Sequence, residues 1–243
     1  MIEWAGKRYW LVGASEGLGA ALAHKMSAAG VHLILSARSE DKLNALAARL
    51  PGKSEVVTVD VSDTESVKAA AAAVGDIDGI VQIAGVYWPF GANKWDADQA
   101  IAMADINFTG AMRLMGAVVP KFVERDAGHI VLTGSLSGFR GLPGAAAYTS
   151  SKAGVMTLAE SLYADLHKTN VRVQLVNPGF VKTRLTDKND FNMPFIMEPE
   201  DAAREFFEHM NTDAFKRSFP TLFSWVFRGS QFLPDWLYYR LFA

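Results

Sequence analysis

The chain has 243 residues, 50% of them hydrophobic, a formal net charge of −2 and no cysteine. This composition suits one large hydrophobic core, and it excludes disulfides, thiolate metal sites and the basic surface that nucleic acid requires. Because no apolar stretch reaches spanning length and no secretion signal precedes the first predicted strand, we expect a cytoplasmic protein.

Short β-rich segments alternate with longer helical segments along most of the chain. We predict strands at residues 8–13, 31–36, 55–60, 79–84, 129–134 and 171–177, and helices at 17–29, 40–50, 64–74, 95–119 and 146–167. Helices between strands imply right-handed crossovers and a parallel sheet, and continuously apolar strands suit a sheet covered on both faces. The predicted fold is therefore α/β, a single-domain Rossmann-type doubly wound parallel sheet with helices on both faces.

A glycine-rich turn, residues 13–19, follows the first predicted strand. In a doubly wound sheet this turn opens a helix and binds a pyrophosphate, for which glycines supply positive φ and close backbone approach. The spacing is wider than the usual dinucleotide fingerprint, and a glycine turn without a ligand is the alternative. We expect six residues of the turn to bind a dinucleotide: Gly13, Ser15, Glu16, Gly17, Leu18 and Gly19.

The end of the second predicted strand bears on the choice between the two nicotinamide cofactors. A carboxylate there would bind ribose hydroxyls, whereas an arginine accommodates a 2′-phosphate. The chain has Arg38 at this point and no acid until Glu40, and a planar guanidinium suits phosphate. Arg38 therefore favours NADP(H) as the cofactor. Because the Glu16 carboxylate would repel the phosphate, NAD(H) is not excluded.

Tyr148 and Lys152 stand four residues apart in a predicted helix and therefore share one face. A free phenol has a pKa of about 10, and a neighbouring ammonium lowers it. Ser135 follows a predicted strand, where its hydroxyl can hydrogen-bond a substrate oxygen. A tyrosine and a lysine at this spacing are weak support alone. Combined with the glycine turn earlier in the same chain, Tyr148, Lys152 and Ser135 predict an enzyme that transfers a hydride and a proton at a carbonyl.

These motifs resemble the short-chain dehydrogenase/reductase family, and the resemblance runs from about Lys7 to Thr183. It implies a catalytic tetrad of Asn107, Ser135, Tyr148 and Lys152. In the family the tyrosine transfers the proton, the lysine holds the ribose and lowers the tyrosine's pKa, the serine orients the carbonyl, and the asparagine holds a water. It also implies cofactor contacts at these positions: Asp60, Val61, Ala84, Gly85, Tyr148, Lys152, Pro178, Gly179, Val181 and Thr183.

Two positions depart from the family pattern. Val12 stands where the family usually has threonine, and Ile83 stands where it usually has asparagine. Replacing both partners of a polar contact by apolar groups can be nearly neutral, whereas losing one would leave the other unpaired. We therefore predict that Val12 and Ile83 lie together in one apolar junction and that cofactor binding is preserved.

The resemblance places the substrate beside residues 86–90, residues 136–143 and a lid after Thr183. These segments are rich in aromatic and apolar side chains, which favours a lipophilic carbonyl substrate, although the same side chains would also serve simply to pack a lid. The predicted pocket residues are Tyr87, Trp88, Leu136 and Leu142. The five histidines show no ligand-like spacing, so we predict no metal site.

We divide the chain into a dinucleotide-binding and catalytic domain, residues 1–218, and an aromatic-rich helical tail, residues 219–243. Pro220 and Pro234 predict the starts of two short helices. The first carries an apolar stripe of Phe219, Leu222, Phe223 and Val226. Three interpretations stay open: packing against the same chain or a partner subunit, peripheral membrane contact, and a cover over the substrate entrance.

The sequence thus predicts an NADP(H)-dependent oxidoreductase that interconverts a ketone or aldehyde and an alcohol. The family resemblance implies a homodimer or homotetramer. Two alternatives remain, an NAD-dependent dehydrogenase of a lipophilic alcohol and a nucleotide-sensing or scaffold protein without catalysis. Because all four tetrad positions are intact, the second alternative is disfavoured.

Overall fold

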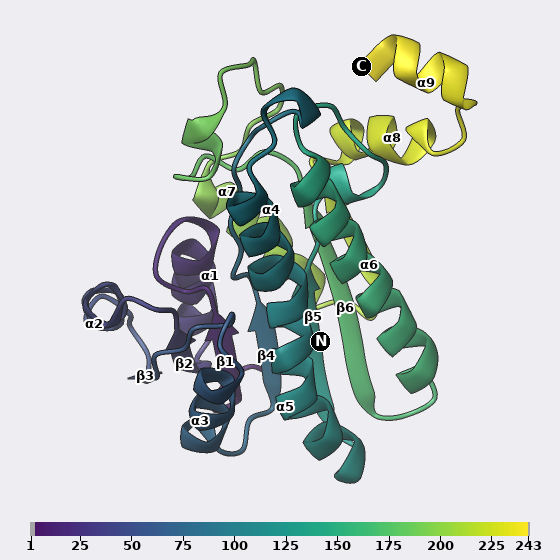
Figure 1. Cartoon of the computed structure of the whole chain (residues 1–243). Helices are drawn as coiled ribbons and strands as arrows, with labels where there is room; N and C mark the ends of the chain where they lie inside the picture. Colours follow the sequence, from purple (N-terminus) through teal and green to yellow (C-terminus); the bar gives the residue numbers. More distant parts are fainter. Residues whose placement is uncertain (1–2, 243) are drawn as a thin grey trace.

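The structure, a computed structural model, describes residues 3–242. Residues 1 and 2 of the predicted domain and residue 243 of the predicted tail lie outside the described residues. Seven strands form one parallel sheet in the order β3-β2-β1-β4-β5-β6-β7 (Figure 1). Their bounds are β1 Arg8–Val12, β2 His32–Ser36, β3 Ser54–Val56, β4 Gly79–Gln82, β5 Gly128–Thr133, β6 Val171–Pro178 and β7 Lys216–Phe219.

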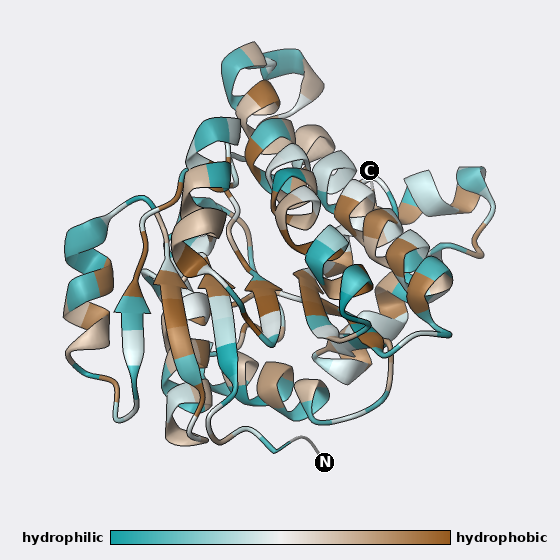
Figure 2. Ribbon diagram, turned by 90° about the horizontal axis from the view of Figure 1, so that it is seen from below, coloured by the Kyte–Doolittle hydropathy of each residue, from teal (hydrophilic) through white to brown (hydrophobic). Residues whose placement is uncertain are grey.

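Helices cover both faces of this sheet. Their bounds are α1 Gly17–Ala28, α2 Glu40–Ala47, α3 Thr64–Val74, α4 Ala97–Ala104, α5 Gly110–Glu124, α6 Ala146–Leu166, α7 Pro199–Met210, α8 Thr221–Ser230 and α9 Asp235–Phe242. One hydrophobic cluster packs α3, α5 and α6 against the sheet, and a second packs α1, α2 and α7 against it. Figure 2 shows the hydrophobic strands in the middle of the molecule with helices on both sides. The predicted doubly wound α/β fold is confirmed.

Two elements were not predicted. The strand β7 pairs in parallel with β6, but its first two residues, Lys216 and Arg217, are exposed and charged, as is common at a sheet edge. Phe219, expected as the first residue of the tail, is instead the fully buried last residue of β7. The helix α7 begins at Pro199 and has acidic residues in its first turn, both ordinary start signals.

The predicted helix at residues 95–119 is interrupted. Its place is taken by α4, a π-helical turn from Asp105 to Thr109, and then α5, which continues to Glu124. Isolated π turns inside helices are often found at functional sites. None of the helices among the described residues is long and apolar enough to cross a bilayer.

The prediction of a shared apolar junction for Val12 and Ile83 was wrong. Their backbones are neighbours, since the Ile83 N–H donates to the Val12 carbonyl at 2.8 Å. However, Val12 is in register with Gln82, and successive side chains of a strand point to opposite faces. Val12 therefore packs with the α3, α5 and α6 cluster, whereas Ile83 packs on the α1, α2 and α7 side.

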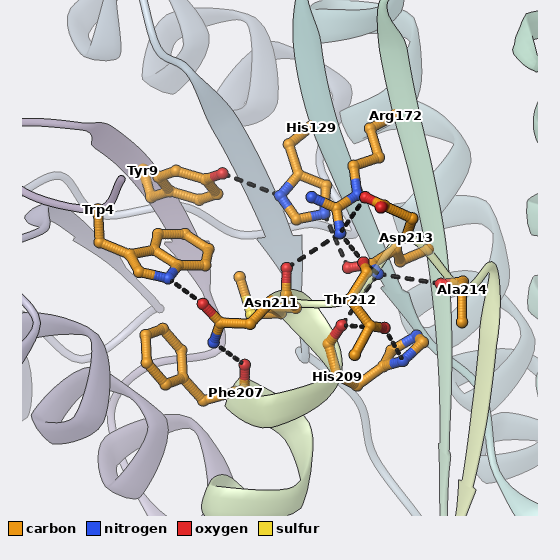
Figure 3. A network of polar contacts seen from close by, with 12 residues as sticks. Trp4, Tyr9, His129, Arg172, Phe207, His209, Asn211, Thr212, Asp213 and Ala214 are labelled. Carbon is orange, nitrogen blue, oxygen red and sulfur yellow. Dashed lines mark hydrogen bonds and ion pairs between the residues drawn. The ribbon is translucent and has the colours of Figure 1, made fainter. Parts of the chain in front are cut away.

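A network of buried polar side chains ties the amino-terminal ends of the strands together (Figure 3). The Tyr9 hydroxyl is 2.9 Å from Nδ1 of His129, whose Nε2 is 2.9 Å from Oε1 of Gln174. The Gln174 amide donates to three carbonyls in and before the loop that leads to β7, those of His209, Thr212 and Ala214. These contacts hold the strands together where they begin, on the opposite side of the sheet from the carboxyl ends of the strands.

Candidate active site

The carboxyl ends of four adjacent strands, β1, β4, β5 and β6, bring the predicted site residues to one edge of the sheet. The glycine turn follows β1, Gly85 follows β4, and Ser135 follows β5. Pro178 ends β6 and Gly179 comes directly after it. Ligand sites of doubly wound sheets form at this edge.

The glycine turn needs its glycines for its own close packing. Gly13 and Gly17 have φ of +96° and +55°, a region that favours glycine. A Cβ on Gly13 would lie 2.4 Å from the Ala84 nitrogen, and a Cβ on Gly19 would lie 2.0 Å from the Gly13 carbonyl oxygen. The Glu16 side chain precedes α1 without capping it, so the first N–H groups of α1 have no side-chain partner there and fit a pyrophosphate.

The segment after β6 meets this turn. A Cβ on Gly17 would lie 2.8 Å from the Thr183 methyl group, so Thr183 lies against the turn. Arg184 forms a 2.6 Å ion pair with Glu16, which also accepts a 2.8 Å hydrogen bond from Lys42. The hydrogen bond from Lys42 lowers the pKa of Glu16, and the two cations offset the repulsion that its carboxylate would exert on a phosphate.

Arg38 is exposed at the end of β2 and makes neither a hydrogen bond nor an ion pair with any of residues 3–242. Although burial raises the pKa of Asp60, hydrogen bonds from Ser62 and the charges of Arg38 and Arg113 together lower it. The Asp60 carboxylate accepts from the Ser62 hydroxyl at 2.6 Å and from its N–H at 3.0 Å. Arg38 therefore offers an unpaired guanidinium near Asp60, where the adenosine is expected. Val61, the residue after Asp60, is buried.

Tyr148 and Ser135 line the same cavity, and Tyr148 lies in the first turn of α6. Burial raises the pKa of the Tyr148 phenol to about 12, although interaction with the Ser135 hydroxyl opposes this shift. The sequence suggested a lowered pKa, and that expectation was wrong for this structure. The reason is that burial penalises the phenolate while the Lys152 ammonium is 6.0 Å from the ring centre.

Lys152 is buried one helical turn after Tyr148, with 4% of its surface exposed. Its Nζ donates to the Thr133 carbonyl at 3.0 Å, and burial lowers its pKa to about 8. A Cβ on Gly85 would lie 3.6 Å from this Nζ and 3.1 Å from Oδ1 of Asn107. Because only the contact with Asn107 would be tight, Gly85 leaves room for the Asn107 amide beside the lysine.

Asn107 lies in the π-helical turn and is completely buried. Its Oδ1 accepts from the Val86 N–H at 2.7 Å, while its Nδ2 donates to the Val86 carbonyl and the Ser151 hydroxyl, both at 3.0 Å. Both the oxygen and the nitrogen of the side-chain amide are therefore hydrogen-bonded within the protein. Asn107 fixes the segment after β4 against α6, one residue before Lys152.

A cavity of about 490 Å³ opens beside Tyr148 and Ser135. Of the predicted pocket residues, Tyr87, Leu136 and Leu142 line it. Trp88 is not among the lining residues and instead lies under the Lys188 ammonium, 4.6 Å from the ring centroid. Phe191 also lines the cavity, and it belongs to the aromatic lid that the sequence placed beside the substrate. The sequence did not single out four further aromatic and apolar lining residues: Phe180, Leu185, Phe223 and Phe227.

The tail is fastened to the loop that borders the cavity. The Arg140 guanidinium donates to the carbonyls of Ser230 and Leu233 at 2.6 and 2.8 Å and pairs with Asp235 at 2.5 Å. It also lies 3.9 Å over the ring of Tyr238, which is 1% exposed. The interpretation that the tail packs on its own chain is thus confirmed for α8 and α9, and Phe223 and Phe227 of α8 also line the cavity.

Residues 3–242 contain no group of three histidine, aspartate or glutamate side chains arranged to hold a metal ion. The site consists of a glycine turn, a cavity lined by a half-buried tyrosine and a half-buried serine, a buried lysine next to them, and an aromatic lid.

The family model described as short chain dehydrogenase matches residues 7–193. An uncharacterized oxidoreductase of Myxococcus xanthus is 38% identical and covers 98% of this chain and 97% of its own length. Among solved structures, a short chain dehydrogenase/reductase from Burkholderia phymatum in complex with NAD superposes with a TM-score of 0.86 at 25% identity, covering 94% of both chains. A short-chain dehydrogenase from Sphingobium yanoikuyae in complex with NADPH gives 0.82 at 27% identity, covering 88% of both.

Proposed function

Since the chain belongs to the short-chain dehydrogenase/reductase family, we propose that it is an NADP(H)-dependent oxidoreductase that interconverts a lipophilic ketone or aldehyde and an alcohol. The observation that carries this proposal is the placement of the Tyr148 phenol and the Ser135 hydroxyl in one wall of a cavity with many aromatic side chains. The coarser statement, an oxidoreductase with a pyridine nucleotide, follows from the family and its solved members.

The glycine turn, with the steric demands at Gly13 and Gly19, would hold the pyrophosphate. Further contacts would come from these positions: Asp60, Val61, Ala84, Gly85, Pro178, Gly179, Val181 and Thr183. When bound, the nicotinamide supplies or accepts the hydride. The two solved relatives carry NAD and NADPH, so the preference for NADP(H) rests on the unpaired Arg38 guanidinium.

The proton would come from Tyr148. With a pKa near 12 the phenol stays protonated at neutral pH, so it can donate its proton to the oxygen of a carbonyl being reduced. The Ser135 hydroxyl would donate a hydrogen bond to the same oxygen. A buried phenolate needs a cation nearby, and the Lys152 ammonium, one helical turn away, is suited to that role.

The substrate would be lipophilic. A cavity of about 490 Å³ lies within the range of small-molecule sites, and its walls include five phenylalanines, among them Phe90 and Phe180. Polar side chains also contribute to the lining, including Asn93, Lys94 and Asp190. A homodimer or homotetramer would cover exposed apolar side chains of α4 and α5 such as Ile101, Met112 and Val123.

The test is consumption of NADPH and NADH with aliphatic and aromatic carbonyls of increasing size, beside a Tyr148→Phe variant. We expect turnover that prefers NADPH, rises with substrate bulk and falls about 100-fold or more without the phenol. Oxidation of a lipophilic alcohol with NAD⁺ as the hydride acceptor instead would favour the NAD-dependent dehydrogenase. Tight NADPH binding without turnover of any substrate would favour a nucleotide sensor.

A further inference from the structure

The helix α8 has two apolar faces. Phe223 and Phe227, four residues apart, point to the cavity and line it. Leu222, Trp225 and Val226 lie on the other side of the helix and are 75%, 62% and 48% exposed. An amphipathic helix normally presents polar residues to solvent, so the outer face of α8 is unusual for a surface helix.

The exposed apolar surface continues beyond α8. Phe232, in the turn between the two tail helices, is 88% exposed, and Trp236 and Tyr239 on α9 are 70% and 57% exposed. We call these six residues, Leu222, Trp225, Val226, Phe232, Trp236 and Tyr239, the outer tail face. Arg140 holds both helices in place, so the outer tail face is presented by a fixed element. Figure 1 shows α8 and α9 at the same end of the molecule as the lid.

The charges near this face are cationic. Arg228 lies 5.4 Å from the Trp225 ring centroid, and neither Arg228 nor Arg240 pairs with a carboxylate among residues 3–242. The tail's one carboxylate side chain, Asp235, is already paired with Arg140. The outer tail face, made of tryptophan, tyrosine, phenylalanine and aliphatic side chains, is therefore accompanied by two guanidinium groups that pair with no carboxylate of residues 3–242.

We propose that the outer tail face docks on an anionic phospholipid bilayer and that the cavity receives lipophilic substrate from the lipid. Tryptophan and tyrosine favour the bilayer interface, while arginines pair with lipid phosphates. The proposal rests on the proposed function for its substrate, because α8 places the wall of a reductase cavity directly behind the surface in contact with lipid.

A second copy of this chain suits the face less well. In a two-fold contact the same surface meets itself, so Arg228 and Arg240 of both copies would be brought together without an anion. Burying unpaired cations is costly, and Asp235 is not free to neutralise them. Lipid phosphates would supply the missing negative charge without displacing Arg140.

Co-sedimentation of the full chain with vesicles tests the docking. The vesicles are phosphatidylcholine alone, and phosphatidylcholine mixed with phosphatidylglycerol. We expect the wild type to sediment with the anionic vesicles and Trp225→Gln/Trp236→Gln to bind roughly tenfold more weakly. Ile101→Gln, which changes a 66% exposed side chain on α4, is the control and should bind like the wild type. Arg228→Gln/Arg240→Gln should reduce the preference for anionic vesicles.

Quenching by brominated lipid gives a readout that needs no variant, because Trp225 and Trp236 would enter the interface. Wild-type protein that stays in the supernatant with both vesicle types, and shows no quenching, would overturn the proposal. So would a wild-type dimer that Trp225→Gln/Trp236→Gln converts to monomers, since the outer tail face would then be a subunit interface.

Turnover of hexadecanal presented in vesicles tests the delivery of substrate. We expect the tryptophan double variant to lose most of this turnover while its reduction of benzaldehyde in water stays at the wild-type rate. Equal hexadecanal rates would refute delivery from the lipid. If the wild type binds vesicles but reduces no carbonyl, the proposed function fails while the docking stands. If it reduces carbonyls but binds no vesicles, the docking fails while the proposed function stands.

Discussion

The Lys152 ammonium donates a hydrogen bond to the main-chain carbonyl of Thr133, 3.0 Å away, inside the protein and away from solvent. Burial lowers its pKa to about 8, below the value in an unfolded chain. The folded protein therefore binds fewer protons than the unfolded chain between about pH 8 and 10.5. The charged lysine costs stability at neutral pH, and this cost fades as the pH rises through that range.

We predict that Lys152→Met is more stable than the wild type at pH 7 by roughly 1–3 kcal/mol of unfolding free energy, and therefore unfolds at a higher temperature. The same variant should lose carbonyl turnover. Thermal unfolding at pH 7, with NADPH consumption measured in parallel, checks both effects. Lys168→Met, at an exposed lysine of the turn after α6, should change neither. A Lys152→Met protein that is less stable than the wild type would contradict the prediction.

Arg38→Ala should weaken NADPH binding by about 10- to 100-fold and leave NADH binding nearly unchanged, because only NADPH carries the phosphate that the guanidinium would bind. Fluorescence titration with each nucleotide measures the two dissociation constants. Arg49→Ala, at another exposed arginine just beyond α2, is the matched control and should affect neither. Equal weakening for both nucleotides would place the 2′-phosphate elsewhere.

Two glycine-to-alanine changes in helices should have opposite effects. At Gly19 in α1 the new methyl group would lie 2.0 Å from the Gly13 carbonyl oxygen, whereas at Gly116 in α5 nothing lies within 4 Å. We expect Gly19→Ala to destabilise the protein by about 1–3 kcal/mol and to abolish nucleotide binding. Gly116→Ala should stabilise it by about 0.5–1 kcal/mol. Denaturant unfolding and NADPH titration of both variants decide the matter; normal NADPH binding by Gly19→Ala would count against the turn as the pyrophosphate site.

The buried histidines predict acid sensitivity. Burial, then the charge of Arg172, lowers the pKa of His129 to about 3, and burial lowers that of His209 to about 4. Between about pH 6.5 and 4 the unfolded chain takes up protons that the folded protein does not, so stability falls as the pH falls. The expected loss is about 1 kcal/mol per pH unit for each histidine in that window.

The slope of unfolding free energy against pH, measured between pH 7 and 5, checks this expectation. His129→Gln should flatten the slope even if it lowers stability at every pH, because the slope reports proton uptake. His24→Gln, at an exposed histidine of α1, should leave the slope unchanged. A wild-type slope of zero would show that neither ring is kept neutral by folding.

Arg140→Ala should release the tail, since it removes the contacts to Ser230, Leu233 and Asp235 together. Chymotrypsin should then cleave the aromatic residues of α8 and α9 several-fold faster than in the wild type. Arg125→Ala is a matched control, because Arg125 also donates to two carbonyls, Ala127 and Ile77, but far from the tail. Tail cleavage at the wild-type rate in Arg140→Ala would mean that other contacts hold the helices.

The parts of the fold that the sequence predicted are those with a strong local signal. Most of the six predicted strands could be found because they are rich in apolar residues, whereas β7 begins with two exposed basic residues and resembles a loop. The interruption of the helix at Asp105–Thr109 leaves no compositional trace, so the π turn that carries Asn107 appears only in three dimensions.

The motifs also indicated where Tyr148, Lys152 and Ser135 would gather, because spacing along a helix and position after a strand are local properties. The direction of the Tyr148 pKa shift was not predictable, since it depends on burial and on where the lysine points. In the tail, the sequence grouped Leu222, Phe223 and Val226 in one stripe, but the structure turns Phe223 to the cavity and exposes the other two. A helix with apolar residues on two sides does not show in its sequence which side faces inward.

The two faces of α8 also limit how this segment can change over time. An α-helix turns by about 100° per residue, so inserting or deleting one residue between Pro220 and Phe223 would turn the cavity-lining phenylalanines toward solvent and bring the outer side chains against the substrate. Single substitutions can adjust either face alone. Among relatives that keep this helix, we therefore expect divergence by exchange of side chains at constant length, with insertions confined to the turn that follows Ser230.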